Sequence, residues 1–110
     1  MIIVTGAAGF IGSCLVSKLN SLDKNNLILV DNFVSLEKDK NLKGKFFEEK
    51  IARSEFIDWF ERNTDKITEV YHIGARTDTT ESNTDIFDKL NLNYSKSLWT
   101  ICVKNRIPFI

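Results

Sequence analysis

The sequence predicts an α/β fold in which helices cover both faces of a parallel sheet. Three observations indicate it. An apolar run at residues 1–4 leads directly into a glycine-rich segment at 5–12, Thr-Gly-Ala-Ala-Gly-Phe-Ile-Gly. A second apolar run at 27–30 ends in Asp31. Strand-like and helix-like segments then alternate to the end of the sequence, as they do where parallel strands need crossover connections. Together these features predict a Rossmann-type sheet.

The glycine-rich segment is the first candidate for a binding site. Gly6 permits a tight turn out of the strand, Gly9 lets a pyrophosphate approach the backbone, and Gly12 lets the following helix pack closely on the sheet. The N–H groups and positive dipole at the start of that helix would face the phosphates. The spacing is Gly-x-x-Gly-x-x-Gly rather than Gly-x-Gly-x-x-Gly. Its place between an apolar strand and a helix favours dinucleotide binding over a purely structural turn.

The second candidate is the acidic end of the strand at 27–30. Asp31 follows Gly12 by 19 residues, close to the roughly 20-residue spacing at which an acidic side chain binds a ribose hydroxyl. An Asp-Asn pair at a strand end is also a common turn. The glycine-rich segment upstream favours the ribose-binding interpretation.

Hydrophobic spacing predicts the remaining elements. After the glycine-rich segment, Ile11, Leu15, Leu19 and Leu22 form a helical stripe. The polar, lysine-rich residues 33–43 predict a surface loop. Further along we expect a short strand at 45–48, a helix at 52–63 with its aromatic residues on one side, a strand at 68–73, a helix at about 84–105 and the start of a fifth strand at 107–110.

The expected fifth strand bears on domain organisation. A parallel strand needs a downstream connection and helix to cover it, and the sequence given stops within this strand. We therefore expect residues 1–110 to be the N-terminal part of an NAD(P)-binding domain, truncated in the fifth strand. The catalytic and substrate-binding parts would lie elsewhere in the protein.

The composition argues against several other classes of protein. Fifteen basic residues balance fifteen acidic ones, so no net field favours nucleic acid or an anionic membrane. No stretch approaches the roughly 20 apolar residues of a membrane span. Cys14 and Cys102 form no metal or redox motif and are expected to be reduced and buried, as in a cytoplasmic protein. His72, the single histidine, is expected to be a packed strand residue, and no metal site is expected.

Three segments resemble one family of enzymes. Residues 72–81 read His-Ile-Gly-Ala-Arg-Thr-Asp-Thr-Thr-Glu, 91–96 read Asn-Leu-Asn-Tyr-Ser-Lys and 107–109 read Ile-Pro-Phe. With the glycine-rich segment they closely resemble the ADP-L-glycero-D-manno-heptose 6-epimerases, which are extended short-chain dehydrogenase/reductases of the NAD-dependent epimerase/dehydratase family. The resemblance runs the whole length of the chain. It implies a homo-oligomeric, cytoplasmic enzyme of lipopolysaccharide core heptose synthesis that transfers a hydride from its sugar nucleotide to NADP and back.

The resemblance also implies roles for individual residues. The backbone at Phe10 and Ile11 would lie beside the pyrophosphate, and Asp31 and Asn32 would bind the adenosine ribose. Residues 73–77 would line the cofactor cleft. The full set of expected cofactor-binding residues is Gly6, Gly9, Phe10, Ile11, Gly12, Asp31, Asn32, Lys38, Arg53, Ile73, Gly74, Ala75, Arg76, Thr77 and Asn91.

The choice of cofactor depends on two cations. Asp31 ordinarily favours NAD, since a carboxylate repels a 2′-phosphate. Lys38 and Arg53 fall where the resembled family places cationic contacts, although each is equally explained as a solvated surface residue. We expect NADP, with NAD as the alternative.

The sequence contains no Tyr-x-x-x-Lys, so no catalytic residue is expected within 1–110 and the fragment alone is expected to be inactive. One alternative is a UDP-sugar 4-epimerase or nucleotide-sugar dehydratase, which would share the glycine-rich segment, Asp31 and Asn91. The run from Arg76 to Glu81 argues against it. The other alternative is a non-catalytic dinucleotide-binding module, against which the open fifth strand argues.

Overall fold

The structure is a computed structural model that describes residues 1–33, 40–73 and 84–110, with only the backbone described at 84–92. Its sheet has the strand order β3-β2-β1-β4, and every strand pair is parallel. The parallel sheet predicted from the sequence is therefore confirmed. The strands are β1 (Ile2–Thr5), β2 (Leu27–Asp31), β3 (Glu49–Ala52) and β4 (Glu69–His72). The helices are α1 (Phe10–Ser21), α3 (Arg53–Asn63), the 3₁₀ turn η1 (Thr64–Lys66) and α4 (Thr84–Lys104).

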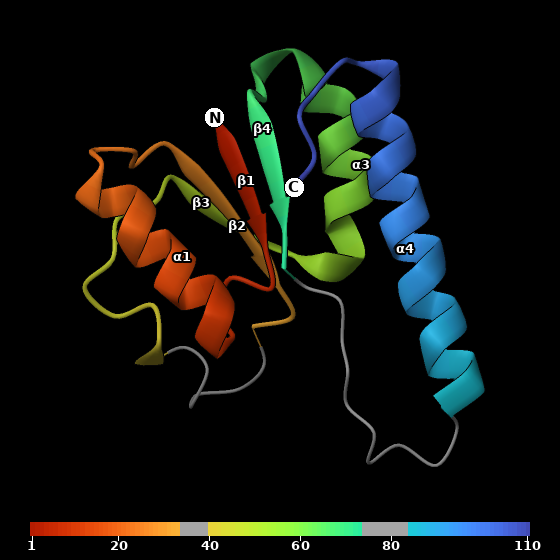
Figure 1. Cartoon of the computed structure of the whole chain (residues 1–110), viewed down its shortest axis with the longest axis horizontal. Helices are drawn as coiled ribbons and strands as arrows, with labels where there is room; N and C mark the ends of the chain where they lie inside the picture. Colours follow the sequence, from red (N-terminus) through yellow and green to blue (C-terminus); the bar gives the residue numbers. More distant parts are fainter. Residues whose placement is uncertain (34–39, 74–83) are drawn as a thin grey trace.

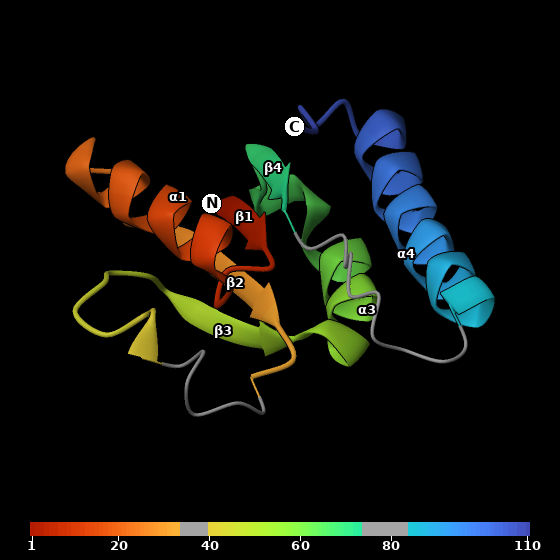
Figure 2. The same ribbon diagram turned by 60° about the horizontal axis from the view of Figure 1, so that its bottom comes forward.

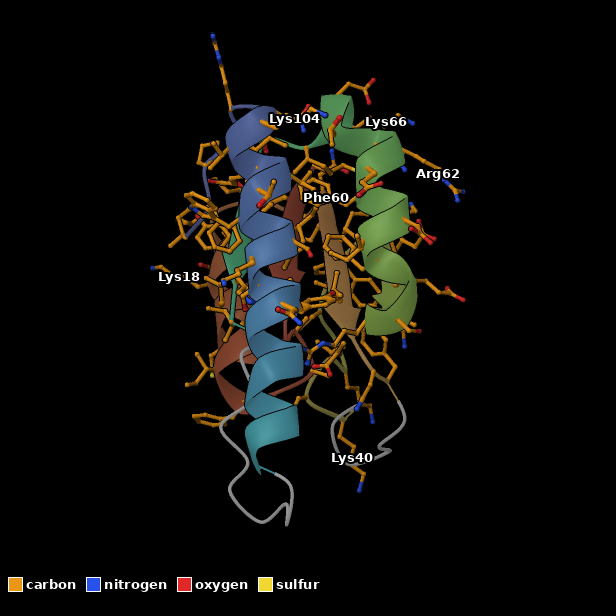
Figure 3. All side chains as sticks on the ribbon, turned by 90° about the vertical axis from the view of Figure 1, so that its right-hand side faces the viewer. Lys18, Lys40, Phe60, Arg62, Lys66 and Lys104 are labelled. Atoms are coloured by element: carbon orange, nitrogen blue, oxygen red, sulfur yellow. The ribbon has the colours of Figure 1, made fainter. Side chains whose placement is uncertain are left out.

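Helices cover both faces of the sheet. In Figures 1 and 2, α1 lies on one face, and α3 and α4 lie on the other. Side chains alternate along β1, so that Ile3 joins the core beneath α3 and α4 while Val4 joins the core beneath α1. Figure 3 shows α3 beside α4, with Phe60 directed between them and Arg62 pointing outward. The aromatic stripe predicted on the helix at 52–63 is confirmed, since Phe56 and Phe60 are fully buried.

The buried face of α1 differs from the predicted stripe. Its buried apolar residues include Val16 and Leu19, whereas the Ile11 and Leu22 side chains are 68% and 54% exposed. Gly12 sets the orientation, because a Cβ atom there would lie 2.1 Å from the Gly6 carbonyl oxygen. The helix therefore turns its glycine toward the sheet, and the residues four and seven positions later follow onto that face.

The third strand was predicted four residues too early. Expected at 45–48, it is instead Glu49–Ala52, and its ladder begins where the Glu48 N–H donates to the Leu27 carbonyl at 2.8 Å. The apolar pair at 46–47 suggested a strand, but Phe46 is 65% exposed. An edge strand covered on one face needs few apolar residues, and here Ile51 is the buried one.

The segment after α4 begins a fifth parallel strand, as predicted. Phe109 forms a bridge to Val70, the Val70 N–H donates to the Pro108 carbonyl at 2.9 Å, and the His72 N–H donates to the Ile110 carbonyl at 2.8 Å. The expectation that both cysteines are buried is half wrong. Cys102 is buried on α4, but Cys14 is exposed, because it lies two residues past Gly12 and faces away from the sheet.

Two features are absent from the described residues 1–33, 40–73 and 84–110. None of those helices combines the length and the apolar content needed to cross a membrane. The same residues contain no group of three or more His, Cys, Asp or Glu side chains arranged to hold a metal ion.

Candidate functional site

The candidate site lies along the edge of the sheet where the parallel strands end. Figure 1 shows β1, β2 and β4 running toward this edge. The glycine-rich segment follows β1, Asp31 ends β2, Arg53 follows β3 and Ile73 follows β4. Open α/β sheets bind ligands at this edge. The topology thus brings together predicted residues that lie up to 67 positions apart in the sequence.

Each glycine of the segment has a different structural role. Gly6 has a φ of 65°, a left-handed conformation that favours glycine, and it turns the chain out of β1. Gly12 permits close packing of α1, as described above. Gly9 is the N-cap of α1 with φ −75° and ψ 172°, and a Cβ atom there would lie 3.4 Å from the nearest heavy atom, the Gly6 carbonyl oxygen. The fold itself therefore leaves room for a Cβ atom at position 9, in contrast to position 12.

The start of α1 has the features of an anion-binding helix end. Its N-cap, Gly9, supplies no side-chain oxygen, and no acidic residue lies in its first turn. The Phe10 and Ile11 side chains are 78% and 68% exposed. The first N–H groups of a helix need partners outside the helix, and its dipole favours a negative charge there. A diphosphate would satisfy both requirements.

Asp31 is hydrogen-bonded to the glycine-rich segment. The Ala8 N–H donates to its Oδ2 at 3.1 Å, and the Asn32 N–H donates to its Oδ1 at 2.8 Å. A carboxylate oxygen can accept more than one hydrogen bond, so these two bonds are compatible with a ribose hydroxyl donating as well. Asn32 itself is exposed beside the carboxylate.

Arg53 lies between the ribose-binding candidate and α4. It follows Ala52, which pairs with Asp31, and its guanidinium carbon is 4.4 Å from the centre of the Tyr94 ring. The Tyr94 hydroxyl donates to the Arg53 carbonyl at 3.4 Å. Burial raises the pKa of Tyr94 to about 12, with the Arg53 charge lowering it and the Asp31 charge adding to the rise. Tyr94 is therefore a neutral packing residue at physiological pH and no candidate for a base.

His72 has two partners that the sequence did not reveal. Its Nδ1 is 2.6 Å from the Thr5 Oγ1, and its Nε2 is 2.8 Å from the Ser95 Oγ. The imidazole thus joins β4 to β1 and α4 at the level where the candidate site begins. Burial lowers its pKa, and the Arg53 charge lowers it further. The prediction of a packed strand histidine is confirmed, but its partners are 67 and 23 residues away, and no local pattern could find them.

The remaining predicted cofactor-binding residues are described only in part or not at all. Ile73 is half-buried directly after β4, and the backbone of Asn91 belongs to α4, although its side chain lies outside the description. Those that fall wholly outside the described residues are Lys38, Gly74, Ala75, Arg76 and Thr77.

Comparison with known proteins gives the family. The family model described as "NAD dependent epimerase/dehydratase family" matches residues 2–110. The chain belongs to this family. It is 36% identical over 112 aligned positions to the ADP-L-glycero-D-manno-heptose-6-epimerase of Fusobacterium nucleatum, covering 100% of this chain and 34% of that protein.

Solved structures agree with the family. The Helicobacter pylori ADP-L-glycero-D-manno-heptose-6-epimerase superposes with a TM-score of 0.79 at 29% identity, covering 98% of this chain and 36% of that one. A Bacillus cereus UDP-glucuronic acid 4-epimerase in complex with NAD gives a TM-score of 0.69 at 28% identity, covering 92% and 35%. This epimerase/dehydratase chain therefore has the Rossmann-type fold of its family, and it spans about a third of the length of the relatives it matches.

Proposed function

We propose that residues 1–110 form the N-terminal, cofactor-binding part of a nucleotide-sugar epimerase that acts on ADP-heptose. One observation carries the cofactor assignment: the Ala8 N–H donates to the Asp31 carboxylate at 3.1 Å. This bond joins the pyrophosphate-binding candidate directly to the ribose-binding candidate, which places the two next to each other as one dinucleotide requires. The names of the curated relatives in Fusobacterium and Cupriavidus support ADP-heptose as the substrate.

The described residues fit a nicotinamide dinucleotide. Gly9 leaves room for a pyrophosphate, the first turn of α1 offers N–H groups and a favourable dipole, and Asp31 offers acceptors for ribose hydroxyls. In the proposed site Phe10 and Ile11 contribute backbone groups rather than side chains. Asn32 would lie beside the adenosine ribose, and Ile73 would lie beside the cofactor at the end of β4.

The chemistry divides between this part of the protein and the rest. A bound nicotinamide would take a hydride from the heptose and return it to the opposite face. The residues of 1–110 would hold the dinucleotide so that its position does not change between the two transfers. We place the tyrosine base and its lysine partner in the rest of the protein, because no Tyr-x-x-x-Lys occurs here.

We further propose that the cofactor is NADP rather than NAD. Arg53 follows Ala52, which pairs with Asp31, so its side chain starts from the backbone beside the strand end that carries the carboxylate, which would otherwise repel a 2′-phosphate. Stacking on Tyr94 uses the face of the guanidinium, whereas phosphate is bound by its in-plane N–H donors. Lys38 is the second proposed cation. We also propose that the full-length protein is a cytoplasmic homo-oligomer.

The test is turnover by the full-length protein. Purified enzyme is incubated with ADP-D-glycero-D-manno-heptose, and the configuration of the heptose is followed by NMR. We expect conversion to an equilibrium of the two epimers, without net consumption of cofactor. Parallel reactions with UDP-glucose test the alternative of a UDP-sugar 4-epimerase, and turnover of that substrate alone would replace the ADP-heptose proposal. Cofactor binding without turnover of any nucleotide sugar would support a non-catalytic module.

A further inference from the structure

A turn far from the glycine-rich segment in sequence is hydrogen-bonded to it. The Asn41 Nδ2 donates to the Ala8 carbonyl at 2.9 Å, across 33 residues. The turn is itself held in place, because Leu42 is buried in the core beneath α1 and the Lys45 Nζ donates to the Asn41 carbonyl at 2.6 Å. Since a carbonyl can only accept, the atom of Asn41 that faces Ala8 must be the amide nitrogen.

This contact completes a pair of bonds around Ala8. The Ala8 N–H is held by Asp31 and the Ala8 carbonyl by Asn41. A peptide unit is planar, so the Ala8 carbonyl and the Gly9 N–H move as one body. The bond from Asn41 therefore fixes the plane that carries the Gly9 N–H, which donates to the Gly6 carbonyl at 3.1 Å. Asp31 fixes the preceding plane in the same way.

We propose that Asn41 is a positioning residue for the dinucleotide, which it orients by holding the Ala8–Gly9 peptide. The inference rests on the proposed cofactor site. A loop whose peptide planes are already set binds a pyrophosphate without the entropic cost of ordering. Asn41 acts through the backbone of Ala8 and Gly9 and needs no contact with the ligand.

The chain offers a matched control at the other end of α1. The Asn20 Nδ2 donates to the Phe46 carbonyl at 3.0 Å, and the Phe46 N–H donates to the Asn20 Oδ1 at 2.9 Å. Asn20 thus ties the segment that follows the Asn41 turn to α1 itself, through the same type of side chain. It does so near the C-terminus of α1, away from the glycine-rich segment. Losing Asn20 should affect stability without affecting the loop around Gly9.

The experiment uses full-length protein and the variants Asn41→Leu, Asn41→Ala and Asn20→Leu. Dissociation constants for NADP, NAD and ADP are measured by calorimetry, and melting temperatures are measured without ligand. We expect both Asn41 variants to raise the dissociation constants of all three ligands by a similar factor of about ten. All three ligands share the pyrophosphate, and the loss of one hydrogen bond has about this effect. Asn20→Leu should lower the melting temperature and leave the dissociation constants within about twofold.

The measurements distinguish a failure of the positioning role of Asn41 from a failure of the proposed cofactor site. Unchanged affinity in folded Asn41 variants would overturn the positioning role, and so would an equal loss of affinity in Asn20→Leu. If Asn41→Leu does not fold, the smaller Asn41→Ala carries the test alone. A wild-type protein that binds none of the three ligands would instead overturn the proposed cofactor site, and the inference with it.

Discussion

We predict that replacing Gly9 by valine weakens dinucleotide binding strongly and changes the stability of the fold little. The Gly9 backbone has φ −75° and ψ 172°, a conformation that β-branched residues adopt readily. An added Cβ atom would meet the Gly6 carbonyl oxygen at 3.4 Å, which is an ordinary contact. Valine is a poorer N-cap than glycine, but it also restricts the unfolded chain. These opposing effects should leave the free energy of unfolding within about 1 kcal/mol of wild type.

The effect on binding should be far larger. The valine methyl groups would occupy the space through which the pyrophosphate reaches the first turn of α1. A hydrogen bond to a charged group is worth about 1.5–3 kcal/mol, so losing two of them costs roughly 3–6 kcal/mol. That range corresponds to a weakening of at least about 100-fold, because 1.4 kcal/mol is a factor of ten.

The assay is calorimetric titration of NADP and NAD into full-length Gly9→Val, with circular dichroism and a melting curve as the test of folding. Gly12→Ala is the matched control. A Cβ atom at position 12 would collide with the Gly6 carbonyl oxygen. This variant should therefore show a lower melting temperature, in contrast to Gly9→Val. A folded Gly9→Val variant with wild-type affinity would refute the assignment of the glycine-rich segment to the cofactor.

Three further predictions concern the fragment, the cations and the histidine. The isolated chain of 110 residues should show no epimerase activity and should associate through an unpaired sheet edge; detectable turnover of ADP-heptose would contradict this. Lys38→Ala and Arg53→Ala should each weaken NADP more than NAD in titrations of the full-length enzyme, and equal losses would mean that neither cation binds the 2′-phosphate. The pKa of His72 is lowered from 6.5 by burial and by Arg53, so the unfolded state binds more protons below about pH 6.5. Stability from this group is therefore complete above that pH and is lost as the pH falls toward the folded-state pKa. In denaturant unfolding at several pH values, the free energy of unfolding of His72→Gln should fall less between pH 7 and 5 than that of the wild type. An equal fall in the two proteins would argue against this coupling.

The sequence by itself determined the class of fold and the position of the glycine-rich segment. Both depend on neighbouring residues: an apolar run, a turn that needs glycine, and the period of a helix. The spacing from Gly12 to Asp31 could also be predicted from the sequence, because a single crossover connection of standard length separates the two residues. The family resemblance also followed from contiguous segments.

The tertiary structure decided which residues meet. Pairing with β2 placed the third strand at Glu49–Ala52, where only one of its faces needed to be apolar. Close packing at Gly12 turned α1 so that Val16 was buried and Cys14 was exposed. The partners of His72, and the two side chains that hold Ala8, come from segments 23 to 67 residues away. Hydrogen bonds between such distant polar groups leave no periodicity in the sequence, because their geometry exists only once the sheet has brought the ends of its strands to one edge.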